Sequence, residues 1–352
     1  MVSIEADSSA QGAGKYPIEM KRVAVIGAGS WGTALGIVAA WRGHEVRLWS
    51  RNAGVIESIN RQHVNAIYLP DSHIPERVQA TAKIEEALEL AELVILAAPS
   101  HATRPILTGM VPVVDPEMIF VSASKGIEID SGKRISQIVA EVVGEKFQPR
   151  FVSLSGPSFA KEVVEKHPTA VVAASPSAGL GRSVQAELSS EYFRIYTNDD
   201  VVGTELGGSV KNVIAIAAGM VAGLGFGSNT IAALITRGLA EMTRLALKEG
   251  AKLETLMGLA GLGDLVLTCT GNLSRNRFVG QELGKGRSLE EITSGMQEVA
   301  EGVKTSQALK SLTRRLGVEM PITSEVHAVL YEGETVQEAA ANLMTRPLRE
   351  EI

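Results

Sequence analysis

At residues 27–32 the chain reads Gly27-Ala28-Gly29-Ser30-Trp31-Gly32, directly after an apolar run at residues 23–26 and at the start of a helix-like segment. A G-x-G-x-x-G sequence between a strand and a helix is typical of a turn that binds the pyrophosphate of a dinucleotide. Gly27 would allow the tight turn, Gly29 would let the backbone approach the ligand, and Gly32 would let the helix lie close to the sheet. Free N–H groups at the helix start would then hold the pyrophosphate. The alternative is a glycine turn that binds no ligand.

Arg51 follows the next strand-like run, residues 45–50, in which apolar residues alternate with polar ones. A site for NAD usually has an Asp or Glu here, which binds the ribose hydroxyls. An arginine can instead hold a 2′-phosphate through its planar fork of donors. The sequence therefore predicts that NADPH is at least tolerated beside NADH, with a merely solvated Arg51 as the alternative.

Composition limits the class of protein. The chain has 352 residues, which is long enough for two domains, and its 45% apolar content with 35 glycines fits a packed α/β protein. A net charge of −6 without a basic cluster argues against nonspecific nucleic-acid binding. Cys269, the only cysteine, excludes an internal disulfide, fits a reducing compartment such as the cytoplasm, and lies in an apolar setting that makes it a poor nucleophile. We expect no integral membrane segment, no signal peptide and a flexible tail at residues 1–19.

The pattern of elements divides the remaining chain. In residues 20–200, short β-rich runs alternate with helical stretches, which predicts a parallel-type sheet covered by helices on both faces. The runs are residues 23–26, 46–49, 93–97, 119–122, 151–154, 170–173 and 192–196. From residue 201 to 352, long helical segments take over, including residues 208–221, 230–249, 274–283 and 305–316. We therefore expect an α/β, Rossmann-type doubly wound NAD(P)-binding domain followed by an all-α substrate-binding domain.

Several predicted strands end in polar or special residues, at the edge where open α/β sheets bind ligands. Ser100 follows one strand, Lys125 the next, and Gly156 with Ser158 a third. Either serine can also cap the helix that follows it. Lys125 would point its cation into the crevice where an anionic ligand lies, unless it is a solvated loop lysine.

Lys211 lies near the start of the expected helix 208–221, which is apolar on almost every face and should be buried. In the first turn, both desolvation and the positive end of the helix dipole would favour the neutral amine. A lysine with such a lowered pKa is suited to proton transfer near neutral pH. Alternatively, Lys211 extends to the surface and only Asn212 bonds locally.

Two further groups in the helical half have polar side chains suited to a small ligand. Asp264 follows a glycine-rich stretch, where it can accept bonds from a substrate hydroxyl, orient a lysine, or simply cap a helix. Ser274, Arg275 and Asn276 place a hydroxyl, a guanidinium and an amide at a predicted helix start, a combination suited to a phosphate group. A solvated basic face is the alternative for this second group.

Taken together, these segments resemble the bacterial NAD(P)-dependent sn-glycerol-3-phosphate dehydrogenases from about Lys21 to near Gly333. The motifs that carry the resemblance are residues 27–32, 99–101, 124–126, 156–160, 210–212, 261–264 and 274–277. The resemblance implies reversible reduction of dihydroxyacetone phosphate to sn-glycerol 3-phosphate with NADPH or NADH, a supply of precursor for glycerophospholipids, and a homodimer.

The resemblance also implies roles for individual residues. Lys211 would donate and accept the proton, Lys125 would stabilise charge as a second catalytic residue, and no metal is expected. The implied cofactor contacts are Gly27, Gly29, Ser30, Trp31, Gly32, Arg51, Lys125, Ala160, Arg275, Val299 and Glu301. The implied substrate contacts are Lys125, Gly156, Ser158, Lys211, Asp264, Ser274, Arg275 and Asn276, with Arg275 and Asn276 on the phosphate. Val299 and Glu301 rest on the resemblance alone, and Glu301 fits equally well as a carboxylate at a helix start.

Two other functions remain open from the residues themselves. A dehydrogenase for a β-hydroxyacid or sugar acid could use Lys211 and Arg275 to bind the substrate carboxylate. A noncatalytic NADPH sensor on the same fold would bind nucleotide without turnover, but it would have no need of two lysines and an Arg-Asn pair.

Overall fold

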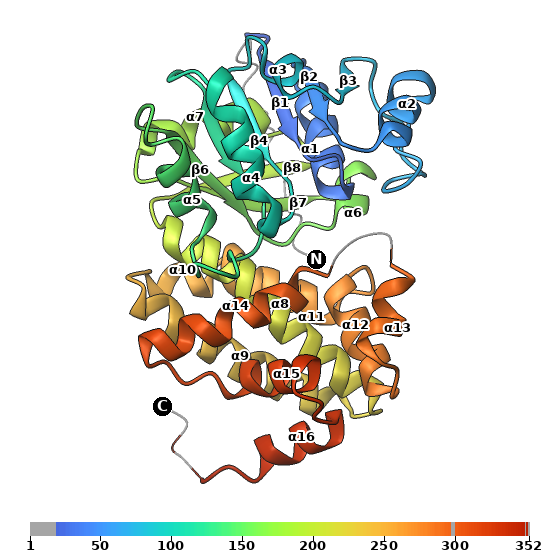
Figure 1. The fold of residues 1–352 in the computed structure, drawn as a ribbon, viewed down its shortest axis with the longest axis vertical. Coiled ribbons are helices and arrows are strands. Elements are labelled where there is room, and N and C mark those ends of the chain that lie inside the picture. Colours follow the sequence, from blue (N-terminus) through green and yellow to red (C-terminus); the bar gives the residue numbers. More distant parts are fainter. Residues whose placement is uncertain (1–18, 297–299, 349, 351–352) are drawn as a thin grey trace, which may run out of the picture.

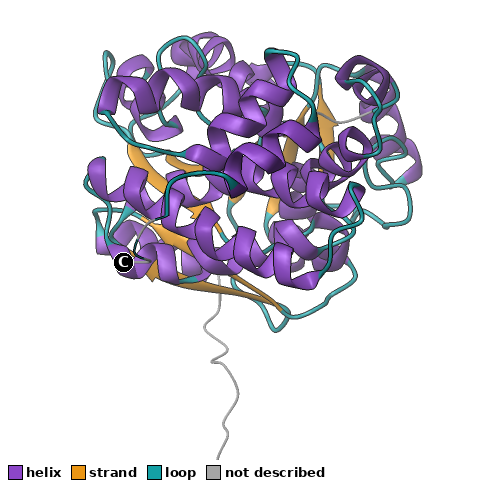
Figure 2. Ribbon diagram, turned by 90° about the horizontal axis from the view of Figure 1, so that it is seen from below, coloured by secondary structure: helices purple, strands orange, loops and turns teal. Residues whose placement is uncertain are grey.

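The computed structural model describes residues 19–296, 300–348 and 350. A sheet with helices on both faces forms the N-terminal part, and a group of helices below it forms the C-terminal part (Figure 1). Seen from below, the C-terminal end of the molecule presents mostly helices (Figure 2). The expected order, an α/β Rossmann-type region followed by a helical region, is confirmed.

The sheet has eight strands in the order β3-β2-β1-β4-β5-β6-β7-β8. They are β1 (Arg22–Ile26), β2 (Glu45–Trp49), β3 (Val78–Thr81), β4 (Leu93–Leu96), β5 (Ile119–Ser122), β6 (Arg150–Ser155), β7 (Thr169–Ala174) and β8 (Phe193–Asn198). All seven predicted runs are strands, and β3 was not predicted. The sheet is mostly parallel, as the predicted parallel-type sheet requires, and the exception is β7, which pairs antiparallel with β6, while β8 runs parallel to β7.

Both faces of the sheet are covered, and β1 shows why its residues are apolar throughout. Val23 and Val25 join one buried cluster, whereas Ala24 and Ile26 join the other. The first face carries α1 (Ser30–Trp41), α2 (Ala53–Gln62), α6 (Ala160–Val164) and α7 (Ala178–Leu188). The second carries α3 (Ile84–Leu88), α4 (Ser100–Met110) and α5 (Ile135–Val142), with a short 3₁₀ helix at Val111–Val113. A strand buried on both sides has no polar face, as in other doubly wound sheets.

The turn after β1 lies where the strand order reverses, between β1 and β4. Gly27 has a φ of +118°, and a Cβ there would lie 2.8 Å from the backbone nitrogen of Ala98. A Cβ on Gly32 would lie 1.9 Å from the carbonyl oxygen of Gly27. Only glycine fits these two positions, so the start of α1 lies directly against the crevice at the carboxyl ends of the strands.

The helical part is built around α8 (Val201–Gly223), which packs against α9, α11, α12 and α14. The other helices are α9 (Ser228–Lys248), α10 (Leu253–Met257), a π-helix (Leu259–Gly263), α11 (Asp264–Thr270), α12 (Arg275–Gly284), α13 (Leu289–Ser294), α14 (Glu301–Leu316), α15 (Pro321–Tyr331) and α16 (Val336–Met344). Asp200 caps α8 by accepting a hydrogen bond from Gly203 N at 2.8 Å. The helix therefore begins seven residues earlier than the predicted residue 208.

Helix α8 is also long and apolar enough to cross a bilayer by length and composition. Within the protein, 83% of its most apolar window is buried. Among the described residues no other helix meets the same criterion. Burial among neighbouring helices accounts for its composition without a membrane.

Candidate active site

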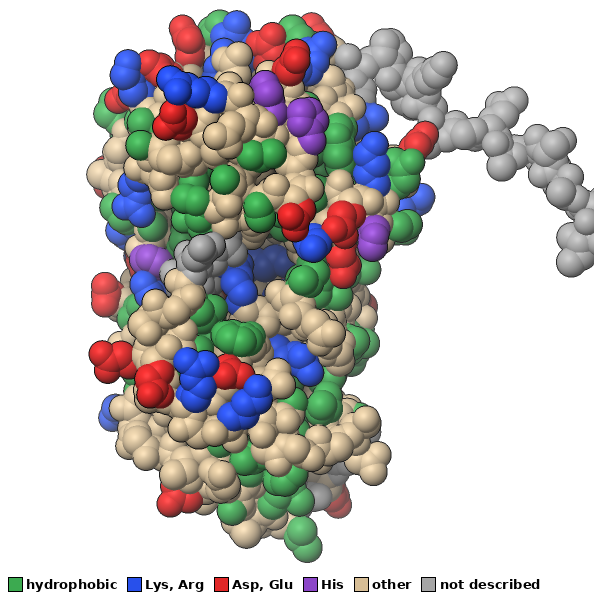
Figure 3. Space-filling view, turned by 90° about the vertical axis from the view of Figure 1, so that its right-hand side faces the viewer, with side chains coloured by type: hydrophobic (Ala, Val, Ile, Leu, Met, Phe, Trp, Pro, Cys, Tyr) green, Lys and Arg blue, Asp and Glu red, His purple; other side chains and the backbone are tan. Residues whose placement is uncertain are grey.

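A cleft of about 630 Å³ separates the carboxyl edge of the sheet from the helical part. Figure 3 shows this hollow between the upper and lower parts of the molecule, with basic side chains at its floor. Most of the predicted site residues line it: Gly27, Gly29, Ser30, Trp31, Arg51, Lys125, Ser158, Ala160, Lys211, Ser274, Arg275, Asn276 and Glu301. Gly32, Gly156 and Asp264 lie behind this lining, and Val299 lies outside the described residues.

Two lysines from different parts of the fold meet on one carboxylate at the cleft floor. Lys125 donates from Nζ to Asp264 Oδ2 at 2.7 Å and to the carbonyl oxygen of Gly156 at 3.1 Å. Lys211 donates from Nζ to Asp264 Oδ1 and to Thr268 Oγ1, the latter at 2.8 Å. Asp264 is fully buried, so a single carboxylate balances two cations in a site of low polarity.

The Lys211 ammonium is held in an environment that disfavours its charge. Burial is the largest effect, the Lys125 cation adds to it, and Asp264 opposes both, which lowers the pKa of Lys211 from 10.5 to about 7. Because α8 begins at Val201, Lys211 lies ten residues inside the helix and not in its first turn. The prediction that the helix dipole lowers the pKa of Lys211 is therefore wrong, since the effect of the dipole fades beyond the first turn. The alternative that Lys211 extends to the surface is also wrong, because the residue is 5% exposed.

The glycine-rich stretch before Asp264 brings its carboxylate against α8. A Cβ on Gly207 of α8 would lie 2.5 Å from the carbonyl oxygen of Ala260, so the two backbones are in contact there. Asp264 is the first residue of α11, and its side chain accepts bonds from the lysines. The structure thus supports an orienting role for this residue over a simple helix cap.

The start of α12 forms the opposite wall of the cleft. Ser274 caps the helix by accepting from Arg277 N at 3.2 Å. Arg275 is exposed and lines the cleft. The amide of Asn276 donates to Asn212 Oδ1 at 3.0 Å and accepts from Gly302 N at 2.8 Å, which ties α12 to α8 and α14. A cationic side chain and a fixed amide therefore face the cleft at a helix N-terminus, where anions are stabilised.

Ser100 makes a contact that the sequence did not predict. Its hydroxyl donates to Glu301 Oε2 at 2.8 Å, joining the first residue of α4 to the first residue of α14. Burial raises the pKa of the Glu301 carboxyl, and the bond from Ser100 opposes that effect. Ser100 makes no cap bond to α4, and Ser158 donates to the carbonyl oxygen of Gly156, so neither serine caps a helix as the alternative supposed.

Asn65 makes further contacts that the sequence did not predict. It is fully buried and donates from Nδ2 to the carbonyl oxygen of Ala28 at 2.9 Å and to Thr33 Oγ1 at 2.8 Å. Its Oδ1 accepts from Tyr68 N at 3.2 Å, and Tyr68 lines the cleft. The amide thus joins the glycine turn to a cleft wall, and a buried asparagine in a segment without periodicity gives no sequence signal for this.

The end of the cleft beside β2 carries Arg51, which is exposed and lines the cleft. Asn52 beside it caps α2 by accepting from Gly54 N and Val55 N at 2.9 and 3.2 Å. At the other end of the glycine turn, the indole Nε1 of Trp31 is buried without a hydrogen-bond partner. An unpaired buried donor on a cleft wall fits a site that a polar ligand completes.

Cys269 is buried in α11, and that burial raises the pKa of its thiol to about 12. The expectation that it is a poor nucleophile agrees with this environment. Across residues 19–296, 300–348 and 350, no group of three or more His, Cys, Asp or Glu side chains is placed to hold a metal ion.

Comparisons with known proteins match nearly the whole chain to one family. The family models described as the N-terminus and C-terminus of NAD-dependent glycerol-3-phosphate dehydrogenase match residues 22–180 and 200–341. A glycerol-3-phosphate dehydrogenase (NAD(P)+) of Koribacter versatilis is 53% identical over 335 residues, covering 95% of this chain and 99% of its own. That of Citrifermentans bemidjiense is 50% identical over 332 residues, covering 94% and 99%.

Solved structures give the same result. The crystal structure of glycerol-3-phosphate dehydrogenase from Coxiella burnetii superposes with a TM-score of 0.90 at 41% identity, covering 93% of this chain and 99% of its own. A ketopantoate reductase from Ralstonia eutropha superposes with a TM-score of 0.55 at 16% identity, which shows a shared fold and nothing more.

Proposed function

The chain belongs to the family of NAD(P)-dependent glycerol-3-phosphate dehydrogenases, and from that premise we propose which of its residues carry out the family's reaction. The family reduces dihydroxyacetone phosphate reversibly to sn-glycerol 3-phosphate, and this chain is an oxidoreductase of that kind. The observation that carries the residue assignments is the pair of lysines on Asp264 at the floor of the cleft.

The dinucleotide fits the crevice above β1 and β4. Gly27, Gly29 and Gly32 keep side chains away from the start of α1, whose first N–H groups have no side-chain cap. Ser30 and Trp31 begin that helix, and its N–H groups would hold the pyrophosphate. When bound, the nicotinamide supplies or accepts the hydride. The remaining proposed cofactor contacts are Arg51 at the adenosine, with Lys125, Ala160, Arg275 and Glu301 elsewhere along the cleft. Val299 is also proposed as a contact, from the resemblance alone.

Proton transfer is assigned to Lys211. During reduction, negative charge grows on the ketone oxygen, and a donor has to meet that oxygen as the charge develops. Lys211 has a pKa near 7 and lines the cleft, so it can give its proton in reduction and take it back in oxidation. Lys125 stabilises the developing charge, and Asp264 holds both lysines in place.

The substrate phosphate is assigned to the start of α12. The guanidinium of Arg275 and the amide of Asn276 face the cleft there, beside the cap residue Ser274. Gly156 and Ser158 approach from the sheet side. Binding the phosphate at a distance from the reacting carbon fixes the position of that carbon. A carboxylate substrate would be bound by the same cation, but the comparisons support that alternative at the level of the fold only.

The assignment of Arg51 predicts an effect on NADPH but not on NADH. Replacing Arg51 by aspartate should raise the KM for NADPH about 10- to 100-fold, because a charge-assisted contact to the 2′-phosphate is lost, and leave the KM for NADH within about twofold. Initial rates on dihydroxyacetone phosphate with each cofactor measure this, and turnover in those assays also tests the proposed function against the sensor alternative. Arg61→Asp is the control, because Arg61 is an exposed arginine on α2 outside the cleft. Equal losses for both cofactors would remove Arg51 from its role.

The pKa of Lys211 gives a prediction about pH. Glycerol 3-phosphate oxidation needs the neutral amine, so kcat/KM should rise with pH through about 7 and then level off. Dihydroxyacetone phosphate reduction needs the ammonium, so kcat/KM should fall as pH rises through the same region. Initial-rate profiles in both directions measure the two limbs. Profiles with midpoints near pH 10 in both directions would show that the pKa of Lys211 is not lowered as proposed.

The cellular setting and the division of the chain are also proposals. We place the enzyme in the cytoplasm as a homodimer that feeds glycerophospholipid synthesis. Residues 20–200 form the NAD(P)-binding domain and residues 201–352 the substrate-binding domain. Of the expected flexible tail, residues 1–18 lie outside the described residues. Sedimentation of the purified protein would test the dimer.

A further inference from the structure

The segment between β5 and α5, residues 126–134, is a hairpin that reaches from the sheet into the helical part. Ile127 and Arg134 form an antiparallel bridge, and Glu128 N donates to the carbonyl oxygen of Lys133 at 3.0 Å. Ile127 is 1% exposed and belongs to the buried cluster of the helical part, with Ile129 packed against it. Lys125 directly precedes this hairpin, so its backbone is anchored in the core that surrounds α8.

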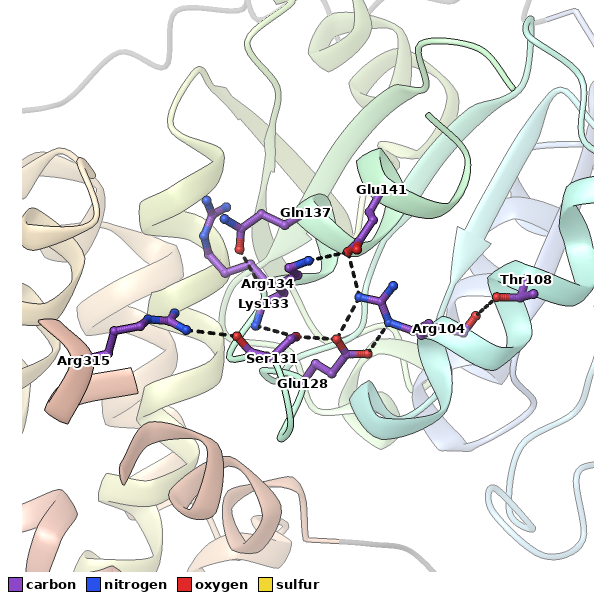
Figure 4. Close-up of polar contacts among 9 residues, drawn as sticks. All are labelled: Arg104, Thr108, Glu128, Ser131, Lys133, Arg134, Gln137, Glu141 and Arg315. Carbon is purple, nitrogen blue, oxygen red and sulfur yellow. Dashed lines mark hydrogen bonds and ion pairs between the residues drawn. The ribbon is translucent and has the colours of Figure 1, made fainter. Parts of the chain in front are cut away.

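Side chains on the outer side of the hairpin fix its shape (Figure 4). Arg104 of α4 binds Glu128 with two parallel bonds at 2.8 and 2.9 Å and also reaches Glu141 of α5. Arg315 of α14 donates to the carbonyl oxygen of Ser131 at 3.2 Å. The hairpin is therefore held both by the sheet part and by the helical part.

Glu205 of α8 holds the inner end of the same segment. Its carboxylate accepts from Ser136 N at 2.7 Å, from Ser136 Oγ at 2.5 Å and from Arg134 Nη1 at 2.8 Å. The Glu205 side chain is 5% exposed and that of Arg134 is 12% exposed. Burial raises the pKa of the Glu205 carboxyl, and the Arg134 cation opposes that effect. This buried ion pair takes no part in the chemistry assigned above.

Glu205 and Lys211 lie on one helix, six residues apart, which corresponds to about 9 Å along the axis. Helix α8 therefore carries Lys211 directly and, through Glu205, fixes the hairpin that follows Lys125. The two lysines reach opposite oxygens of Asp264 from these two attachments.

We propose that Glu205 is a positioning residue of the reaction: by holding Arg134 and Ser136 it fixes the hairpin, and thereby keeps the Lys125 ammonium beside that of Lys211. This inference rests on the proposed function, because it concerns the lysine to which proton transfer is assigned. Its consequence is that loosening the hairpin displaces the Lys125 ammonium and so changes the electrostatics of Lys211, although Glu205 itself does not line the cleft.

The test is the variant Glu205→Gln, which keeps the shape of the side chain but removes the charge opposite Arg134. The groups that face Lys211 are Lys125, Asp264 and the thiol of Cys269. Of these, Lys125 alone is placed by the hairpin, and its cation lowers the pKa of Lys211. In Glu205→Gln, the acid limb of kcat/KM for glycerol 3-phosphate oxidation should therefore move about one pH unit to the alkaline side.

Glu241→Gln is the matched control. Glu241 is 2% exposed and holds the start of α15 through Ile322 N, Thr323 N and Thr323 Oγ1, at 2.6, 3.1 and 3.1 Å. It resembles Glu205 in burial and in the bonds it accepts, but none of these residues lines the cleft. Both variants should lower the midpoint of denaturant unfolding, and only Glu205→Gln should move the pH limb.

Each outcome decides the inference. A limb that stays in place in folded Glu205→Gln, or that moves equally in Glu241→Gln, would overturn the positioning role while leaving the role of Lys211 intact. A wild-type profile without a limb near 7 would overturn the assignment of proton transfer to Lys211, and this inference with it. If Glu205→Gln does not fold, Ser136→Ala decides by the same criterion. It removes the hydroxyl that donates to Glu205 and accepts from Arg134, keeps the bond from Ser136 N to Glu205, and should give a smaller alkaline displacement.

Discussion

Replacement of Lys211 by alanine is expected to lower kcat for reduction of dihydroxyacetone phosphate by about 10²- to 10⁴-fold, the usual contribution of a positioned proton donor. The KM for NADPH should change by less than about threefold, because that contact set lies mainly on the sheet side of the cleft. Steady-state kinetics in both directions, with NADPH binding followed separately by fluorescence, measures the two effects.

The same variant allows a check by chemical rescue. Removing the Lys211 side chain opens space beside Asp264 and Thr268, which a small primary amine can occupy. Methylamine or ethylamine should restore part of kcat in Lys211→Ala, in proportion to its protonated fraction during reduction. Lys125→Met is the comparison, because it removes the neighbouring cation but retains the proton donor. Near-normal turnover in Lys211→Ala would remove Lys211 from its assigned role.

Replacement of Asp264 by asparagine is expected to have the second largest effect. The change leaves the buried Lys211 ammonium and the partly buried Lys125 ammonium without their shared anion. Breaking a buried ion pair in this way costs about 3–5 kcal/mol of folding free energy. The pKa of Lys211 should fall further below 7, since Asp264 is the group that opposes burial there. Reduction at pH 7 then loses its proton donor, and the acid limb of oxidation moves to lower pH. Denaturant unfolding and the two pH profiles measure these effects.

Asp200→Asn separates stability from chemistry in that experiment. Asp200 is 6% exposed and accepts from Gly203 N and Lys252 N, both at 2.8 Å, but it does not line the cleft. This variant should lose stability while its pH profiles stay in place. An Asp264→Asn protein whose profiles match those of the wild type would show that the carboxylate does not control the lysines.

Local patterns predicted most of the fold, and the failures have identifiable causes. Residues 78–81, which form β3, read Val-Gln-Ala-Thr, and one short edge strand with a single strongly apolar residue gives little periodicity. The reversal between β6 and β7 depends on how distant strands meet, which no local pattern records. The start of α8 had a usable signal, because Asp200 precedes an apolar run as an N-cap does.

The site was predictable only as a set of residues. The sequence singled out both lysines and Asp264, and the cleft brings them together. The contacts around them were not predicted: Thr268 accepts from Lys211, Asn212 accepts from Asn276, and Ser100 donates to Glu301. Each of these contacts joins elements far apart in the chain. The residue types suited to proton transfer could therefore be recognised in the sequence, whereas the contacts that position them could not.

The buried thiol of Cys269 has a practical consequence. It lies one residue beyond Thr268, it is the only cysteine in the sequence, and its pKa of about 12 leaves almost no thiolate at neutral pH. Alkylating reagents attack the thiolate, so they modify this chain only during moments when α11 separates from α8. The labelling rate of the unaltered enzyme is thus a direct measure of how often the floor of its active site opens to solvent.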